Sequence, residues 1–422
     1  LMSGGGFVTN LSPPETLFFS KSLINAIRGP CLFGMDLESQ SKISKEQLMR
    51  IGYSLALCAL ALSLISPIHS HAQNSQAGGA VFVMNNAADK NEILSFQRAA
   101  DGTLQAAGKF ATGGRGSGGN NDPLGSQGSL TLSQDRAFLF AVNAGSGELS
   151  VFRVHGASLA LTQRIPTGGS EPVAVAQHGD LVYVLNAGGS SEVVGFAFFY
   201  GRLIRIPGSL RFLSTNASGA ASLAVSPDGA FLAVTEKATN SIDVFQIHAN
   251  GTLSSIVVNQ SSDPGVFAVT FAPNGALLVA ETGSTGVANG STVASYAVLA
   301  GGSLFPISTG VPTFGNANCW NAATPDGRFV YNSNAGSANI AGFAIDANGA
   351  LSPLPGTVVG SNPAGATNLD IAVSADSKFV YTLNSGNGSI GIFAIQPDGT
   401  LNNLGAAGSF APTTGFNGIA VN

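Results

Sequence analysis

Charged residues, and residues that bind metals or form disulfides, are scarce in this chain. Only 10% of its 422 residues are charged, and it has five histidines and three cysteines. Cleavage of a predicted signal peptide would leave Cys319 as the only thiol, so the mature chain could form no internal disulfide. No Cys or His spacing matches a metal site. We therefore expect no bound metal and no cofactor.

Basic residues are also few, with 18 Lys and Arg against 23 Asp and Glu and a net charge of −5. They form no basic stripe, which argues against a nucleic-acid partner. The apolar run 51–65 is short for a membrane span and follows Lys42, Lys45 and Arg50, while 70–72 offers a small-residue cleavage site. These features predict a signal peptide over 35–72, export to the periplasm or cell exterior, and no membrane span after cleavage.

Glycine, in contrast, is abundant, with 55 residues. Glycine supplies positive φ in tight turns, and the many Val and Thr residues suit pleated strands, so the composition predicts a β-rich chain. Residues 1–34 show no periodicity and are left unassigned. We assign 73–422 to one folded domain and expect a monomer.

A short phrase of an aromatic residue, a small loop, Gly and Leu recurs seven times at steps of about fifty residues, as expected for a repeat fold. Each phrase predicts a hairpin, and in six repeats a second turn such as Ser-Pro-Asp-Gly precedes it. The aromatic residues that open the phrases are Phe96, Phe152, Phe196, Phe245, Tyr296, Phe343 and Phe393.

The repeat unit is four antiparallel strands, named A to D here, which is one blade of a β-propeller. The segment 416–421 matches strand A with no strand B after it, and the domain begins at strand B with 80–84. We predict an all-β, seven-bladed propeller whose C-terminal strand joins the N-terminal blade and so leaves no open edge.

The strand directions sort the connections onto two faces. The B-to-C and D-to-A connections share one face, called the upper face, and the A-to-B and C-to-D turns share the other. The upper connections are longer and more variable, with 113–127 the longest. Because variable loops commonly carry binding sites, we expect the working site on the upper face.

Strand B ends on Asn in most blades, including Asn334 and Asn384, which we consider as substrate-binding residues. Glu236 breaks this series, and Glu281 lies nearby, one residue out of step. We predict these two carboxylates as catalytic, because a concave channel mouth can raise the pKa of a carboxyl group. The alternative is that these side chains only bond to backbone groups of their loops.

Further substrate-binding candidates lie near the starts of the A strands and in the upper loops. The first group should point toward the mouth of the channel, whereas Arg115 and Lys237 could meet an anionic group. The histidines His155, His178 and His248 map to turns on the opposite face and are interpreted as surface residues. The A-strand candidates are Ser222, Trp320, Asn321 and Asp370.

The strand phrases 182–186, 329–331 and 379–384, alternating with Ser-Pro-Asp-Gly turns, resemble the lactonase-type seven-bladed propellers over about residues 79–422. That family includes bacterial 6-phosphogluconolactonase, fungal carboxymuconate cyclase and YVTN-repeat surface proteins. The resemblance implies His, Arg and Glu on the upper face for opening or closing a lactone. Glu236 matches the acidic position of the family. Where the family carries its cationic residues, this chain has residues 221–222, 172–173 and Asn334.

Three functions stay open at this point. The first is an exported lactonase-like hydrolase or isomerase acting on a lactone or sugar derivative. The second is a non-catalytic binding or scaffold propeller, in the periplasm or at the cell surface, for a glycan or protein partner. The third is a structural repeat protein with no defined ligand.

Overall fold

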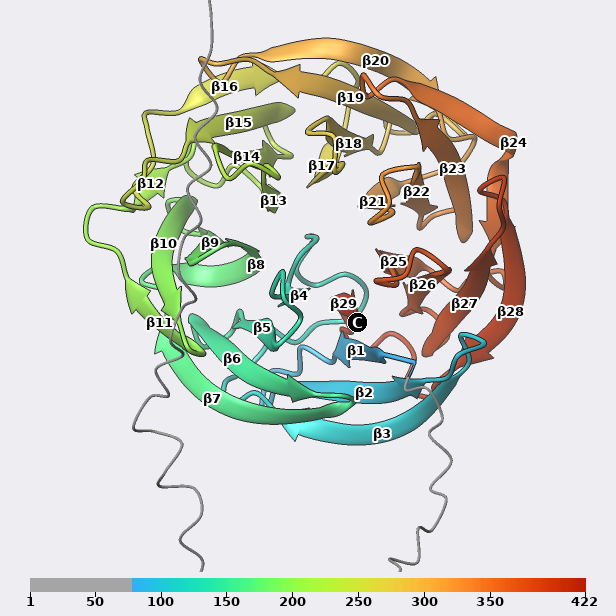
Figure 1. Cartoon of the computed structure of the whole chain (residues 1–422), viewed down its shortest axis with the longest axis horizontal. Helices are drawn as coiled ribbons and strands as arrows, with labels where there is room; N and C mark the ends of the chain where they lie inside the picture. The colour runs from blue at the N-terminus through green and yellow to red at the C-terminus, as the bar shows by residue number, and fades with distance from the viewer. Residues whose placement is uncertain (1–77) are drawn as a thin grey trace, which may run out of the picture. The chain divides into compact units, whose positions relative to one another are not determined.

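A computed structural model describes residues 78–422, which fold into seven antiparallel sheets arranged as blades around a central channel (Figure 1). The predicted all-β, seven-bladed propeller is confirmed. Residues 1–34, the predicted signal peptide 35–72 and both Cys31 and Cys58 lie outside the described residues. Within 78–422 no helix is long and apolar enough to cross a membrane.

The first three blades follow in chain order from the ring closure. Strand D of blade 3 is interrupted, so two short strands pair with β10 there. Blade 1 contains β29 (Ile419–Val421), β1 (Ala80–Met84), β2 (Glu92–Arg98) and β3 (Leu104–Ala111). Blade 2 contains β4 (Leu130–Leu132), β5 (Phe138–Asn143), β6 (Glu148–His155) and β7 (Ser158–Pro166). Blade 3 contains β8 (Ser170–His178), β9 (Leu181–Gly188), β10 (Glu192–Phe199), β11 (Arg202–Arg205) and β12 (Arg211–Phe212).

The remaining four blades each have four strands in the order A to D from the channel outward. Blade 4 contains β13 (Ala220–Val225), β14 (Phe231–Glu236), β15 (Ser241–Gln246) and β16 (Val257–Gln260). Blade 5 contains β17 (Val266–Phe271), β18 (Leu277–Glu281), β19 (Thr292–Val298) and β20 (Leu304–Pro312). Blade 6 contains β21 (Asn318–Ala323), β22 (Phe329–Asn334), β23 (Asn339–Ile345) and β24 (Leu351–Ser361). Blade 7 contains β25 (Asn368–Val373), β26 (Phe379–Asn384), β27 (Ser389–Ile395) and β28 (Leu401–Ala407).

The C-terminal strand closes the ring as predicted. In β29, Val421 pairs with Val81 and Ile419 with Val83 of β1. The same strand contacts β25 of blade 7 and β4 of blade 2, so the innermost strands form a continuous circle. No blade edge is left unpaired at this seam, which removes the edge that an open array would expose.

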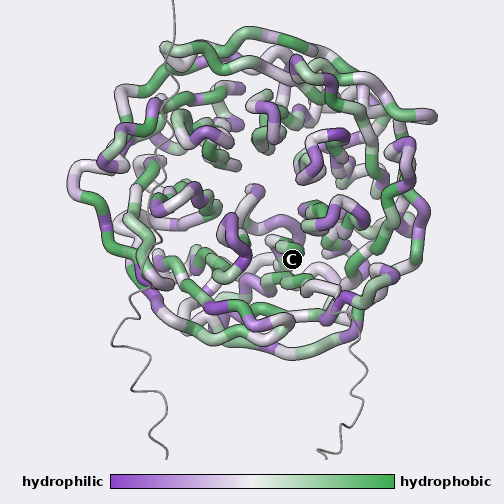
Figure 2. Tube along the Cα trace, viewed as in Figure 1, coloured by the Kyte–Doolittle hydropathy of each residue, from purple (hydrophilic) through white to green (hydrophobic). Residues whose placement is uncertain are grey.

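The repeated aromatic residues form the core between sheets, and hydrophobic stretches follow the strands of the blades (Figure 2). A second set of aromatics joins neighbouring blades through the turn glycines. The Tyr381 hydroxyl donates to the carbonyl of Gly102 at 2.8 Å, from blade 7 to blade 1, and Tyr331 makes the same contact with Gly399. Gly102 has a φ of 87°, which favours glycine because a side chain there would be strained.

The ring has two different ends. The upper end carries the B-to-C and D-to-A connections, and the lower end carries the A-to-B and C-to-D turns. The predicted site residues lie at the upper end or on the inner strands.

Candidate functional site

Glu236 ends strand β14 at the upper end, where its side chain is fully buried. Its carboxylate accepts hydrogen bonds from the Ser214 amide at 2.8 Å, from the Ser214 hydroxyl, and from the Thr239 hydroxyl at 2.7 Å. Ser214 belongs to the connection that arrives from blade 3. Glu236 therefore joins two neighbouring blades, and its oxygens are engaged within the protein.

Glu281 holds the equivalent place in blade 5, and the prediction that it lies one residue out of step is wrong. It ends β18 and pairs with the first residues of β17 and β19, as Glu236 does in blade 4. Its buried carboxylate accepts from the Ser261 hydroxyl at 2.7 Å, the Asp263 amide at 3.0 Å and the Thr292 hydroxyl at 2.8 Å. Burial raises the pKa of Glu281 despite these bonds.

Asn334 and Asn384 end their B strands in the same way. Asn334 accepts from the Thr313 hydroxyl at 2.9 Å, and Asn384 donates to the Asn362 side chain at 3.0 Å. Thr313 and Asn362 lie in the connections that arrive from the preceding blades. Glu236, Glu281, Asn334 and Asn384 thus each bond to the connection that arrives from the preceding blade. We name these four residues the clasp row, because their bonds hold the ring together at its upper end.

A second carboxyl group lies beside Glu236. Asp243 on β15 is fully buried, and neither of its oxygens has a hydrogen-bond partner among residues 78–422. Burial, and then the neighbouring Glu236 carboxylate, raise the pKa of Asp243 to about 8. Asp243 is therefore expected to hold its proton at neutral pH.

The longest connection, 112–129, leaves blade 1, crosses the upper opening of the channel and enters blade 2; we name it the crossing loop (Figure 1). The Trp320 indole donates to the Ser126 carbonyl at 2.9 Å. The side chain of Gln127 donates to the Asn321 carbonyl at 2.7 Å and accepts from the Asn321 amide at 3.1 Å. Because Trp320 and Asn321 lie on β21 of blade 6, two of the predicted binding residues hold this loop in place.

Lys237 and Asp122 secure the same loop near blade 4. The Lys237 ammonium donates to the Gly125 carbonyl and lies 5.0 Å from the centroid of the Phe267 ring. Asp122 accepts from the Asn417 side chain at 3.0 Å. Burial raises the pKa of Asp122 to about 6 although Lys237 opposes the shift, and burial lowers the pKa of Lys237.

The last two predicted residues lie apart from these contacts. Asp370 is buried and accepts from the Ile419 amide at 3.0 Å, so it anchors the closing strand β29, and burial raises its pKa to about 7. Arg115 lies in an exposed part of the crossing loop, where its amide donates to the Ser146 hydroxyl at 3.0 Å in blade 2. Arg115 therefore lies over blade 2, whereas Lys237 belongs to blade 4.

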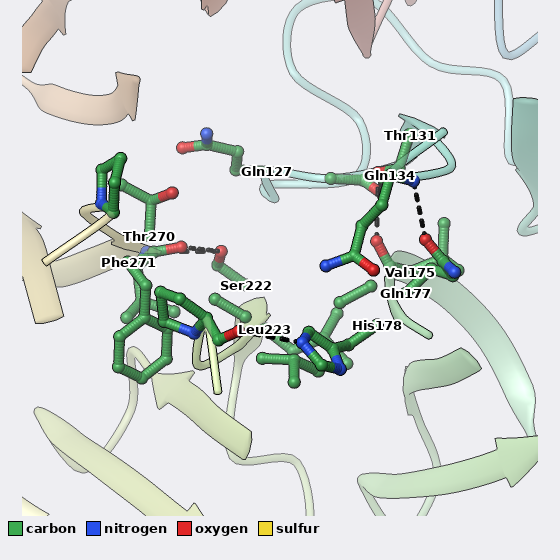
Figure 3. A pocket seen from close by; sticks show the side chains of 17 residues that line it. Gln127, Thr131, Gln134, Val175, Gln177, His178, Ser222, Leu223, Thr270 and Phe271 are labelled. Carbon is green, nitrogen blue, oxygen red and sulfur yellow. Dashed lines mark hydrogen bonds between the residues drawn. The ribbon is translucent and has the colours of Figure 1, made fainter. Parts of the chain in front are cut away.

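Below the crossing loop the channel holds a cavity of about 400 Å³ that extends to the A-to-B turns (Figure 3). Gln127 of the crossing loop lines it, and Ser222 is the predicted site residue that also does so. The other polar side chains that line it are Thr131, Gln134, Gln177, His178 and Thr270.

Three residues that line this cavity each carry a polar group with no hydrogen-bond partner within the described part of the chain: the Gln134 side-chain amide nitrogen, the Thr270 hydroxyl and Nδ1 of His178. They come from blades 2, 5 and 3. His178 Nε2 lies 2.9 Å from the Pro227 carbonyl, which can only accept. The neutral ring therefore carries its proton on Nε2, and Nδ1 presents a lone pair.

Metal binding and cysteine chemistry find less support among the described residues. Among residues 78–422 no group of three or more His, Cys, Asp or Glu side chains could hold a metal ion. Cys319 is a buried free cysteine, and burial raises the pKa of its thiol. Because the thiolate is the reactive form, Cys319 is poorly suited to act as a nucleophile.

Seven four-stranded blades around a polar channel define the class of protein as a seven-bladed propeller with a channel cavity. The family model described as "Lactonase, 7-bladed beta-propeller" matches residues 69–198 and 206–298, more than half of the chain. The chain belongs to this lactonase family of seven-bladed propellers. No curated protein sequence matches it.

Several solved structures share the fold at low sequence identity. A candidate 6-phosphogluconolactonase from Bacteroides uniformis is 21% identical, with a TM-score of 0.63 over 82% of this chain and 99% of that one. The periplasmic gluconolactonase of Pseudomonas aeruginosa is 19% identical, with a TM-score of 0.58 over 81% and 98%. Hydrazine synthase of Kuenenia stuttgartiensis is 18% identical, with a TM-score of 0.54 over 78% and 98%. The same architecture thus serves unrelated chemistry.

The sequence did not lead us to predict site roles for the channel residues Gln134, Thr270 and His178. His178 was assigned to a turn on the lower face, which is where it lies, but that turn borders the channel. Gln134 and Thr270 are ordinary polar residues in a sequence rich in them. Their position in the repeat could have identified them, because they lie at the lower ends of A strands or in the turns that follow. A closed ring brings these positions from different blades together around the channel.

Proposed function

We propose that this protein binds a neutral lactone or small sugar derivative in its channel cavity. One observation carries the proposal: three blades present polar groups with unused hydrogen-bonding capacity to a single hollow. Its volume of about 400 Å³ lies within the range of about 300–1,000 Å³ typical of small-molecule sites.

The chemistry of the lining favours a neutral ligand with several oxygens. Amide and hydroxyl groups donate to and accept from ring hydroxyls and a lactone carbonyl, and Val175 and Leu223 supply an apolar surface for the ring. No lysine or arginine lines the cavity among the described residues. A phosphorylated lactone would bury its charge there without a cation, which is costly.

The test is a calorimetric titration of the purified protein with a panel of aldonolactones and neutral monosaccharides. Thr270→Val removes one free hydroxyl and keeps a β-branched side chain on β17, so we expect affinity to fall about five- to tenfold. Thr313→Val, in a clasp-row contact at the upper end, is the matched control and should leave affinity unchanged. Equal affinities for the wild type and Thr270→Val would contradict the proposal.

Hydrolysis or isomerisation of the lactone is a second candidate function, favoured by membership of the lactonase family and by His178. In this scheme Nδ1 of His178 is the general base that activates a water for attack on the lactone carbonyl. Glu236, with Lys237 or Arg115 holding an anionic group, is the alternative catalytic set at the upper end.

A pH-stat assay with lactones separates these arrangements. If His178 is the base, His178→Gln loses turnover but keeps most of the affinity, and Glu236→Gln keeps its turnover. Loss of turnover in a folded Glu236→Gln protein would place the chemistry at the upper end instead. No turnover with any lactone would leave a non-catalytic binding propeller.

We also propose that the protein is exported, because basic residues precede the apolar run 51–65 and a small-residue site follows it. Cell fractionation and N-terminal sequencing of the mature protein should place it in the periplasm or medium, beginning near Gln73. Retention in the cytoplasm with an intact leader would contradict this.

A further inference from the structure

The lower end carries a second hollow beside the channel cavity. It has a volume of about 560 Å³ and lies between the A-to-B turns of blades 2 and 3 and the C-to-D hairpin of blade 3. We name it the rim groove. Its polar and charged residues are Gln134, Asp135, Arg153, Gln177 and Asp180, and its aromatic residues are Phe138, Phe198, Phe199 and Tyr200.

Two of these aromatics face solvent. Phe199 is 61% exposed and Tyr200 is 86% exposed, and their rings meet edge to face with centroids 4.4 Å apart. Phe198 points the other way and packs on Phe138 at 5.1 Å. The inner ring therefore fixes the hairpin, while the outer two, which lie nearly perpendicular to each other, present an exposed apolar surface of the kind that marks a binding site.

The backbone at Tyr200 is strained for so large a side chain. Its φ is 47°, followed by Gly201 at 78°, and the pairing of Phe199 with Arg202 makes this a two-residue hairpin. Such turns favour Asn-Gly, and a bulky residue with positive φ costs of order 1–3 kcal/mol. Asn250 holds the corresponding place in blade 4, without a positive φ. At Tyr200 the strained backbone instead presents a largely exposed ring whose aromatic contact is with its neighbour Phe199.

The rim groove and the channel cavity share a wall, since Gln134 and Gln177 line both. Reciprocal bonds hold this wall rigid: the Gln134 amide donates to the Gln177 side chain at 2.8 Å, and the Gly179 amide donates to the Gln134 side chain at 2.8 Å. The free amide nitrogen of Gln134 thus lies at the boundary between the two hollows.

We propose that the rim groove is a second sugar subsite, so that the lower end takes an oligosaccharide with one unit in the channel and the next packed against the exposed rings of Phe199 and Tyr200. The inference rests on the proposed function for the channel unit. The Asp135 and Asp180 carboxylates accept from vicinal hydroxyls, and with Arg153 as the one cation the groove selects neutral chains over acidic ones.

The test uses the full chain and two neutral ladders, cello-oligosaccharides and N-acetylated chito-oligosaccharides from monomer to hexamer, titrated by calorimetry. Wild-type affinity should rise with length for at least one ladder. Tyr200→Asn suits the positive φ and removes the ring, so the melting temperature should hold or rise while affinity for the longer chains falls about tenfold, with the monomer unaffected. Phe212→Asn removes an exposed aromatic on β12, which pairs with the upper end of β10; this variant is the control and should change neither the melting temperature nor the affinity.

The outcomes separate the two proposals. Monomer binding with no gain from length, or with a gain that survives Tyr200→Asn, overturns the rim groove and leaves the channel function standing. Length-dependent binding that needs Tyr200 but survives Thr270→Val supports the groove and contradicts the channel. If Tyr200→Asn only weakens binding to vesicles of anionic phospholipid, the aromatic surface is a membrane contact and the sugar proposal is wrong.

Discussion

The two ends of the propeller use polar residues in opposite ways. At the upper end the clasp-row side chains form their hydrogen bonds within the protein. Glu281, for example, accepts from the Ser261 hydroxyl, the Asp263 amide and the Thr292 hydroxyl. At the lower end Gln134, His178 and Thr270 keep free groups on a cavity, and Tyr200 is exposed at a strained position.

The difference teaches that charge and burial alone do not identify a site in this fold. A buried carboxylate must find partners to offset its desolvation, and those partners then occupy the atoms that a substrate would need. Glu236 and Glu281 are conspicuous in the sequence because they replace asparagine, yet both do the structural work of the asparagines. Unused hydrogen-bonding capacity beside a hollow is the more informative feature.

Both ends of the propeller depend on a closed ring, so opening the ring should have the largest effect on stability. Deleting 416–422 removes β29 and the partner strand of β1, and exposes Val81 and Val83. We expect loss of cooperative folding, measured by circular dichroism and thermal melting. Asn422→Ala keeps the backbone bond to Ala80 and is the control. A truncated chain that melts like the wild type would contradict the assigned closure.

A smaller but local effect should follow from removing one member of the clasp row. Glu281→Ala removes the acceptor of three hydroxyls and one amide, so the free energy of unfolding should fall by about 3 kcal/mol, while Glu281→Gln should cost less. Denaturant titration measures both. Channel binding of the lactone panel should be unchanged. Normal stability with lost lactone turnover would reverse the comparison and make Glu281 catalytic.

The last effect appears only as the pH rises and concerns Asp243, whose pKa is raised from 3.8 to about 8. A carboxyl group with a raised folded-state pKa costs stability progressively as the pH rises from about 4 to about 8, because the unfolded chain ionises first. Asp243→Asn removes that cost. The variant should match the wild type near pH 4, and its advantage in the free energy of unfolding should grow steadily as the pH rises to 8. Parallel stability profiles across this range would show that Asp243 ionises normally.

The fold could be predicted from the sequence because the repeat carries it. Each aromatic phrase marks one C-to-D hairpin, and the split between 80–84 and 416–421 specifies the closure, which the pairing of Val81 with Val421 confirms. These features are local or periodic. They need no knowledge of how distant loops fold over the channel.

The site was harder to predict because it depends on non-local contacts. Nothing in 112–129 indicates that Gln127 crosses the channel to bond Asn321 on blade 6. Because the loop crosses the channel, Trp320, Asn321 and Lys237, which the sequence predicts as binding residues, form hydrogen bonds that hold this loop in place. The free groups of Gln134 and Thr270 likewise become visible only when all neighbouring bonds are known.

The most direct test of the central claim is a crystal structure of the protein with a neutral aldonolactone. We predict ligand density in the channel cavity, within hydrogen-bonding distance of the Gln134 amide nitrogen, the Thr270 hydroxyl and His178 Nδ1, with the crossing loop in place above it. Density at the upper end, in contact with Glu236 and with 112–129 displaced, would contradict the account.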